Sequence, residues 1–193
     1  MFLHLCAQSF EARAILELGT CLGISGAYLA SVPSRPRLVT LEGSTALASL
    51  AETMLAAMSC RADVVRGPFE NTLQGALHRV AAENLAVNVA YIDGHHDEAA
   101  TLHYVRTVVE HLSSEALVVL DDIHLCSEMW RAWRRLASMP GVAAAVNVGR
   151  FGLLVWRGGD ATPAGWDLSR YTGRWRVGGS RREAMGRFGE CLG

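Results

Sequence analysis

The chain has 193 residues, of which 50% are hydrophobic and 19% are charged. That length suits one domain with its own core, and that composition excludes a disordered, collagen-like or coiled-coil protein. The 18 basic residues nearly balance the 19 acidic ones, so no overall charge indicates binding to nucleic acid. Every basic residue is an arginine, which excludes a lysine nucleophile and a P-loop.

The cysteines and the apolar segments indicate the cellular compartment of the protein. Five cysteines are scattered along the chain without a Cys-x-x-Cys pair, which is typical of neither a disulfide framework nor a zinc site. The first residues lack the basic start and unbroken apolar stretch of a signal peptide, and no apolar segment is long enough to span a membrane. We therefore expect a cytoplasmic protein that binds neither membranes nor nucleic acid.

Short apolar segments rich in β-branched residues alternate with helical segments along most of the chain. This alternation is typical of a parallel α/β sheet with helices on both faces. Ser44 and Ser127 are suitable N-caps for two of the helices. The expected strands are 14–18, 37–41, 62–66, 85–92 and 116–120, and the expected helices are 24–30, 44–58, 70–79, 99–111 and 127–139.

Two further strands are expected at 142–148 and 151–156, separated only by Gly149 and Arg150. Such a short connection joins antiparallel strands. The predicted fold class is therefore α/β, a doubly wound, mostly parallel sheet of seven strands with the last strand antiparallel. We place this domain at residues 1–157. Residues 158–193, rich in glycine and arginine, are expected to form an extension that is either solvated or in contact with a partner.

The first candidate binding segment runs from Glu17 to Gly23, between the first strand and the first helix. Gly19 allows a sharp turn and Gly23 allows the helix to begin close to a ligand, with Thr20 in the loop between them. Ligands of doubly wound sheets bind past the carboxyl ends of the strands, where this loop lies. Glu42, at the end of the second strand, is placed to accept both hydroxyls of a ribose.

This loop favours one kind of nucleotide. A dinucleotide-binding fingerprint has a glycine where this chain has Cys21. The carboxylate of Glu17, which we expect to project into the site, disfavours a pyrophosphate. S-adenosylmethionine carries an ammonium, a sulfonium and a ribose but no phosphate, so it suits an acidic loop. We therefore expect S-adenosylmethionine in preference to NAD.

Two more polar clusters follow buried strands, at Asp93-Gly-His-His-Asp97 and at Asp121-Asp-Ile-His124. Parallel strands end at one edge of a sheet, so Asp93, Asp121 and Asp122 are expected to lie together. Carboxylate oxygens are typical ligands of Mg²⁺ and Mn²⁺, so a divalent cation is one interpretation. In the other, Asp121 caps a turn and Asp93 orients the ammonium of the cofactor without any metal.

With these motifs, residues from about 12 to 157 resemble the class I S-adenosylmethionine-dependent methyltransferases, most closely the group of catechol and caffeoyl-CoA O-methyltransferases. The resemblance implies a Rossmann-like methyltransferase fold with strand order 3-2-1-4-5-7-6. It also implies that the segment from Glu17 to Gly23 is the first cofactor loop, that Glu42 binds the ribose, and that the segment Gly67-Pro68-Phe69 flanks the adenine.

The same resemblance implies a metal site and a general base. In the metal-dependent members, an Asp after the fourth strand and an Asp-Asn pair after the fifth hold a divalent cation. Asp93 and the pair Asp121 and Asp122 fall on those positions, with Asp122 in place of the usual Asn. His96 stands where the catechol enzymes have a general-base lysine. Because histidine titrates near neutral pH, His96 or its neighbour His95 is expected to take the proton of the acceptor beside Asp93.

One departure from the group is the short segment before the first strand, only 13 residues where relatives have several helices. The acceptor site is therefore expected to be open, closed by a partner chain, or suited to a large acceptor. Without covering helices, Val142, Ala144, Val146 and Leu154 are expected to form an exposed apolar patch, and we expect a homo-oligomer.

We expect an enzyme that methylates a hydroxyl of a small molecule or sugar. The alternative from a different class is a methyltransferase-fold subunit that binds the cofactor without catalysis. The short N-terminal segment favours this alternative, and the acidic and histidine clusters oppose it. A metal hydrolase built on His95, His96 and Asp97 would leave Glu17 and Glu42 unexplained.

Overall fold

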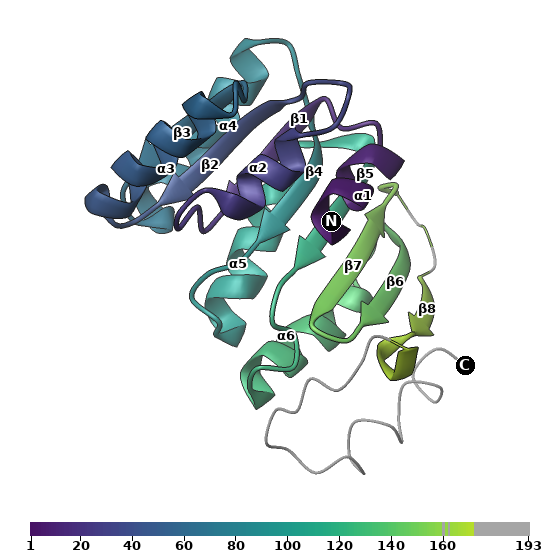
Figure 1. Cartoon of the computed structure of the whole chain (residues 1–193). Coiled ribbons are helices and arrows are strands. Elements are labelled where there is room, and N and C mark those ends of the chain that lie inside the picture. The colour runs from purple at the N-terminus through teal and green to yellow at the C-terminus, as the bar shows by residue number, and fades with distance from the viewer. Residues whose placement is uncertain (160, 162, 172–193) are drawn as a thin grey trace.

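The computed structural model describes residues 1–159, 161 and 163–171. In chain order its strands are β1 (Ala14–Leu18), β2 (Arg37–Glu42), β3 (Ala62–Arg66), β4 (Val87–Ile92), β5 (Leu112–Leu120), β6 (Val142–Val148), β7 (Phe151–Trp156) and β8 (Ala164–Asp167). They form one sheet of order β3-β2-β1-β4-β5-β7-β6-β8, which confirms the predicted order and adds one strand (Figure 1). β1 to β5 pair in parallel, β7 is antiparallel to β5 and β6, and β8 is parallel to β6.

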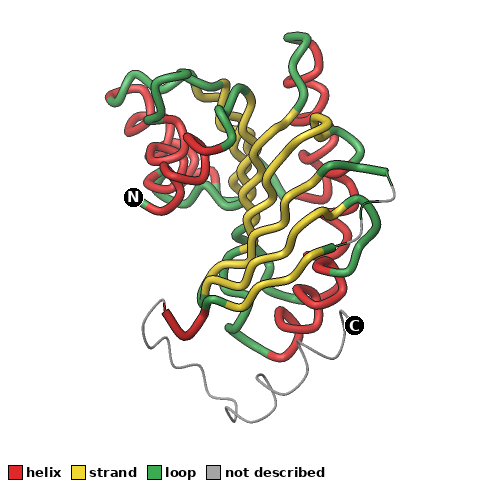
Figure 2. Tube along the Cα trace, turned by 90° about the vertical axis from the view of Figure 1, so that its right-hand side faces the viewer, coloured by secondary structure: helices red, strands yellow, loops and turns green. Residues whose placement is uncertain are grey.

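The helices of the described part are α1 (Phe2–Ser9), α2 (Ile24–Ala30), α3 (Thr45–Ala57), α4 (Phe69–Ala82), α5 (Glu98–Val109) and α6 (Ser127–Ala137), with a 3₁₀ turn at Ser169–Tyr171. α1, α2 and α3 pack on one face of the sheet and α4, α5 and α6 on the other. Figure 2 shows the twisted sheet between these two layers. The doubly wound arrangement predicted from the alternating elements is therefore confirmed.

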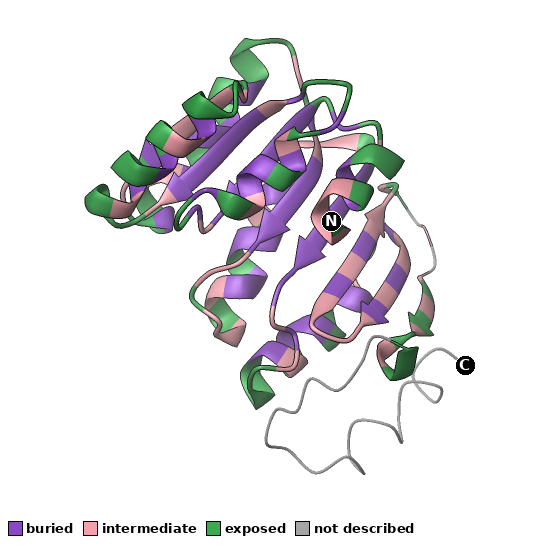
Figure 3. Ribbon diagram, viewed as in Figure 1, coloured by how far each residue is buried: buried purple, intermediate pink, exposed green. Residues whose placement is uncertain are grey.

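The central strands are apolar on both faces because both faces are covered. Leu16 and Leu18 of β1 belong to the core under α4 to α6, whereas Ile15 belongs to the core under α1 to α3. All five residues of β1 are buried, and one of them is the acid Glu17. Figure 3 shows strands buried along their length at the centre of the sheet and alternately buried in β6 and β7.

α1 was not expected from the sequence. Its buried residues are Cys6 and Ala7, and the ring of Phe2 stacks on Phe151 of β7 with centroids 4.7 Å apart. A helix this short depends on packing more than on intrinsic propensity. Phe151 is distant along the chain, so the sequence around α1 does not indicate that a helix packs there. One helix therefore covers part of the sheet that the sequence predicted to be bare.

The apolar patch predicted on the final hairpin is half wrong. Val142 and Leu154 are buried in the core on the side of α6, whereas Ala144 and Val146 lie on the other face and are half-buried. A register irregularity between Val142 and Ala144 places these near neighbours on opposite faces. The predicted four-residue patch is thus divided between the two sides of the sheet.

The predicted extension, residues 158–193, begins with β8 and the 3₁₀ turn, and its part from residue 172 onwards lies outside the described residues. β8 is only four residues long and none of its side chains is buried, so its sequence shows little of the apolar pattern of a strand. None of the helices in the described part of the chain combines the length and apolarity needed to cross a bilayer.

Candidate functional site

The candidate site lies at the carboxyl ends of β1, β2, β4 and β5. Backbone hydrogen bonds carry the parallel pairing past these strand ends: Asp93 N donates to Leu18 O at 2.9 Å, and Asp121 N donates to Ile92 O at 3.0 Å. The loops that follow the strands therefore start side by side. All three motifs singled out from the sequence meet at this edge.

Gly19 is required where β1 ends. Its φ is +100°, and a Cβ there would lie 1.9 Å from the backbone oxygen of Asp93. Only glycine avoids this clash, because the atom that a Cβ would meet belongs to the backbone and cannot move aside as the end of a side chain could. Gly23, with φ +80°, lets α2 begin against α3, where a Cβ would lie 2.9 Å from the Cε of Met54. Both glycines thus hold the first loop close to the elements beside it.

The carboxylate of Glu17, which was expected to project into the site, is turned into the protein interior. Its side chain is fully buried, and its carboxylate accepts hydrogen bonds from the hydroxyls of Ser25 at 2.5 Å and Thr40 at 2.6 Å. Burial raises the pKa of Glu17 to about 7; the two hydroxyls oppose this, and the charges of Asp93 and Glu42 add to it. Glu17 therefore supports the loop from beneath.

Thr20 also turns inward. Its side chain is buried, and its hydroxyl lies 2.5 Å from the Thr40 hydroxyl, which in turn reaches Glu17. Any contact of Thr20 with a ligand would therefore involve its backbone. Thr40 was not identified from the sequence, because an interior threonine on a strand has no distinctive spacing.

Glu42 holds the loop from the end of β2. Its Oε2 accepts from the backbone N–H of Cys21 at 2.8 Å, and its Oε1 accepts from that of Ser44 at 2.8 Å. Cys21 has a left-handed φ of 47°, which is uncommon outside glycine. Glu42 is only partly buried. Each oxygen keeps a lone pair for a hydroxyl of a ligand.

The segment Gly67-Pro68-Phe69 lies beside the same edge. Gly67 N donates to Glu42 O at 2.9 Å, so this segment continues from β3 next to the end of β2. The ring of Phe69 packs against Gly94, where a Cβ would lie 2.5 Å from Cε2 of that ring. This arrangement brings the loops after β3 and β4 together.

His95 turns away from the acidic cluster. Its Nδ1 lies 2.7 Å from the hydroxyl of Tyr104, its Nε2 lies 3.7 Å from Glu70, and its ring packs edge-on to Phe69 with centroids 5.5 Å apart. Asp97 accepts from Ala100 N as the N-cap of α5. The structure therefore separates His95 from the other predicted catalytic residues.

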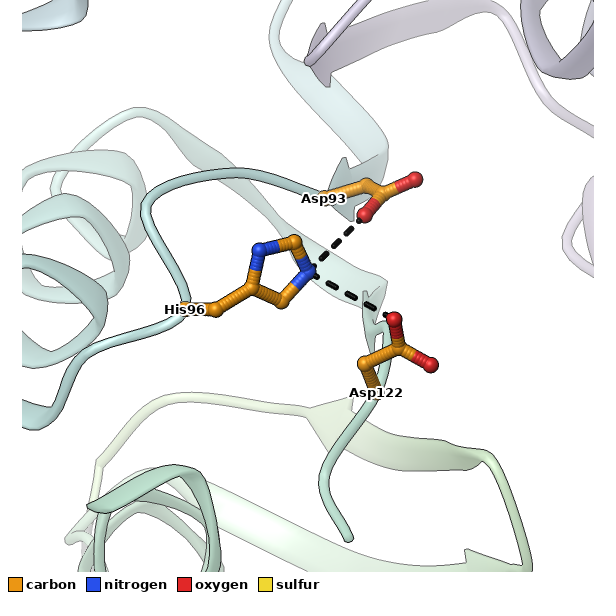
Figure 4. Close-up of side chains that lie close together, drawn as sticks. All are labelled: Asp93, His96 and Asp122. Carbon is orange, nitrogen blue, oxygen red and sulfur yellow. Dashed lines mark ion pairs between the residues drawn. The ribbon is translucent and has the colours of Figure 1, made fainter. Parts of the chain in front are cut away.

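His96 lies between two carboxylates (Figure 4). Its Nε2 is 3.3 Å from Oδ1 of Asp93 and 3.6 Å from Oδ2 of Asp122. One ligand atom from each of these three residues lies within 4.8 Å of the others, close enough to share a cation. His96 and Asp122 have left-handed φ angles of 44° and 51°. Such backbone costs about 1–3 kcal/mol per residue and clusters at functional sites.

Asp121 is the member of the predicted metal set that the structure places elsewhere. It is 1% exposed. Its Oδ1 accepts from Asp122 N at 2.7 Å and from Arg150 Nε, while its Oδ2 accepts from Arg150 Nη2 at 2.7 Å and from the hydroxyl of Tyr91. The cluster that the structure brings together is thus Asp93, His96 and Asp122, with His96 in place of Asp121.

Asp93 shares this network. The Tyr91 hydroxyl, whose hydrogen goes to Asp121, also lies 3.2 Å from Oδ2 of Asp93. Partial burial raises the pKa of Asp93 above its ordinary value, the charge of Asp121 adds to this, and His96 and Arg150 oppose it. Tyr91 and Arg150 were not identified from the sequence. In the sequence, Tyr91 resembles any other residue of an apolar strand, and Arg150 resembles an ordinary residue of a hairpin turn.

Comparisons with known proteins agree with this architecture. A family model described as a methyltransferase domain matches residues 16–123. Cofactor-bound Rv0187 from MTB is 25% identical and has a TM-score of 0.68, with 82% of this chain and 79% of that chain covered. No protein with a curated description matches the sequence.

Two further solved structures share the fold. The O-methyltransferase TomG from Streptomyces achromogenes, involved in tomaymycin synthesis and solved in complex with SAM, is 23% identical with a TM-score of 0.66, and 82% of this chain and 78% of that chain are covered. The O-methyltransferase from Bacillus cereus, solved in complex with SAH, is 21% identical with a TM-score of 0.66, with 81% and 79% covered.

Proposed function

The chain belongs to the methyltransferase domain family, and from this premise we propose that it transfers a methyl group from S-adenosylmethionine to a hydroxyl of a small-molecule acceptor. Two of the similar solved structures carry the name O-methyltransferase and hold SAM or SAH. Their likeness in fold supports the cofactor and the class of acceptor.

The negative field at the first loop is the observation that carries this proposal. Glu17, Glu42 and Asp93 surround the loop, and the charges of the last two raise the pKa of the first. The loop and the segments 42–45, 67–69 and 93–97 contain no arginine. Such a site suits a sulfonium and an ammonium, and it repels the pyrophosphate of NAD.

The residues proposed to hold the cofactor follow from this geometry. Glu42 would accept from the ribose, Asp93 from the ammonium, and the loop of Gly19, Thr20 and Gly23 would lie against the cofactor through its backbone. The segment 67–69 would flank the adenine. Glu17 would act from below, through the hydroxyls of Ser25 and Thr40.

S-adenosylmethionine supplies an already activated methyl group when bound. The protein has to align the acceptor and accept its proton. His96 is the group we propose for the proton, because its Nε2 lies between Asp93 and Asp122 at the edge where the methyl donor is proposed to bind. Asp93 would thereby serve both the cofactor and the base.

A divalent cation, implied by the resemblance to metal-dependent O-methyltransferases, does not fit the three-carboxylate set predicted from the sequence. Both oxygens of Asp121 are bonded to donors, two of them from Arg150. Asp93, His96 and Asp122 lie close enough to share a cation, but His96 is here assigned to the proton, so the proposed mechanism contains no step through a metal.

We also propose a cytoplasmic, homo-oligomeric protein. The described cysteines Cys6, Cys21, Cys60 and Cys126 are free thiols, which suits a reducing compartment. The half-buried face of Ala144 and Val146 supports the oligomer.

Calorimetric titration with S-adenosylhomocysteine tests the cofactor. The wild-type chain should bind it, and Glu42→Ala should weaken binding by about 1–3 kcal/mol, the order expected for lost hydrogen bonds to a charged group. Glu115→Ala is the matched control, because that exposed acid lies in the first half of β5, away from the carboxyl ends of the strands, and pairs with Arg157. Tighter binding of NAD than of S-adenosylhomocysteine would refute the proposal.

A further inference from the structure

Arg150 brings a fixed positive charge into the acidic cluster from the turn between β6 and β7. Its Nε and Nη2 bind the two oxygens of Asp121, and its Nε lies 3.1 Å from Oδ1 of Asp122. A bidentate guanidinium–carboxylate pair combines two charge-assisted hydrogen bonds and fixes the relative orientation of its partners. The guanidinium therefore lies between the two consecutive aspartates after β5.

The lone pairs of Asp121 are fully used. A carboxylate offers about four acceptor positions, and Asp121 receives one donor from Asp122 N, one from Tyr91 and two from Arg150. A metal ion would have to displace Arg150 before this carboxylate could coordinate it. The displaced guanidinium would then lie beside a dication, and two like charges so close repel strongly.

The position of Arg150 is built into the backbone. Its carbonyl oxygen accepts from Ile123 N at 3.1 Å, which ties the hairpin turn to the loop after β5. The preceding Gly149 has a left-handed φ of 83°, and its N–H donates to Oδ1 of Asn147 at 3.0 Å. The guanidinium also packs 5.6 Å from the ring centroid of Phe151. The charge is thus held in place by the fold and does not depend on a flexible surface chain.

We propose that Arg150 is a built-in cation that takes the place of a divalent ion, so that this active site works without a metal. The inference rests on the proposed methyl transfer and states how the same site is charged. Arg150 compensates the buried Asp121 and the adjacent Asp122, and it leaves Asp93 and His96 to face the reacting groups.

Binding of Mn²⁺, followed by the electron paramagnetic resonance signal of the free ion, tests this directly. The wild-type chain saturated with S-adenosylhomocysteine should bind Mn²⁺ weakly. Arg150→Met, which removes the charge and all donors, should bind it more tightly by about tenfold or more, the order of effect that neighbouring groups have on metal affinity. Asp122→Ala, which removes the ligand atom altogether, added to Arg150→Met should abolish the gain.

Arg157→Met is the matched control, because this arginine follows the same hairpin but pairs with the exposed Glu115. It should leave Mn²⁺ binding at the wild-type level. Tight binding of Mn²⁺ to the wild-type chain, or a folded Arg150→Met variant with no gain, would overturn the proposal. The wild-type titration decides the matter even if Arg150→Met does not fold.

Methyl transfer by the wild-type enzyme should also persist in EDTA, and its abolition there with recovery in Mg²⁺ would overturn the inference. Titration of the same samples with S-adenosylhomocysteine separates the two proposals. Loss of that binding would refute the proposed function, whereas metal dependence with intact cofactor binding would refute only the role of Arg150.

Discussion

At the scale of single residues, the buried acid Glu17 makes the stability of the fold depend on pH. Its pKa is about 7 in the folded chain against an ordinary value of 4.5. The unfolded chain therefore loses this proton at lower pH than the folded chain does. The contribution of Glu17 to the free energy of unfolding is greatest below pH 4.5 and falls by about 3 kcal/mol as the pH rises to about 7.

Glu17→Gln should remove this dependence, because a glutamine has no proton to release. The stability of the variant relative to wild type should rise between about pH 5 and pH 8, as measured by urea unfolding at a series of pH values. Glu110→Gln, at an exposed position after α5, is the control. A difference between Glu17→Gln and wild type that stays constant with pH would contradict the raised pKa.

The proposed proton acceptor is testable at the same scale. His96→Ala should lower the rate of methyl transfer about 10²–10⁴-fold, the usual effect of removing a general base. Binding of S-adenosylhomocysteine should change little, because the loop contacts of Glu42 stay in place. His78→Ala, on the exposed side of α4, is the control. An unchanged rate for His96→Ala would exclude this histidine as the base.

At the scale of elements, Asn88 joins the end of α1 to β1 and β4. Its Oδ1 accepts from the backbone of Arg13 at 2.9 Å and Ala14 at 3.3 Å, and its Nδ2 donates to Phe10 O at 2.9 Å. Asn88→Ala should lower the free energy of unfolding by about 1–3 kcal/mol, because partly buried backbone groups lose their partner. Urea unfolding measures the change, and the exposed helical Asn71→Ala should show almost none.

Most strands and helices could be predicted from the sequence, and a few segments were missed. Apolar segments with β-branched residues, such as Leu117 to Leu120, encode a strand covered on both sides, and that signal is local. Ser44 likewise caps α3 as its type suggests, with Oγ accepting from Leu47 N. α1 and β8 were missed because each is short and depends on partners distant along the chain. The start of β5 at Leu112, with Glu115 exposed, was missed for the same reason.

The position of the site could be predicted from the sequence, but its hydrogen bonds and ion pairs could be predicted only in part. Parallel topology alone brings Asp93 and Asp122 to one edge, since both follow adjacent strands. Which aspartate has its oxygens occupied by donors depends on side chains of other elements. Tyr91 lies on β4, and Arg150 comes from a hairpin that pairs with β5. No local spacing relates these residues to Asp121, so the three-carboxylate metal set could not be corrected from the sequence.

At the scale of the whole molecule, the sheet face of Ala144 and Val146 is the surface on which we expect copies of the chain to meet. Both side chains are half-buried, and Trp166 of β8, which pairs with Val146, is 50% exposed. Light scattering should give the mass of a dimer or a larger assembly, and Val146→Asp should shift it towards the monomer. A monomeric mass for the wild-type chain at micromolar concentration would contradict this expectation.

The contacts of Glu42 have a kinetic consequence. Its carboxylate is already fixed by Cys21 N and Ser44 N before any ligand arrives, and Gly19 locks the loop against the end of β4. A ribose entering this site would find its acceptors oriented, so association would freeze few rotamers and would lose little conformational entropy. Capture should then require no reshaping of the loop, and affinity differences among loop variants should lie mainly in the rate of release.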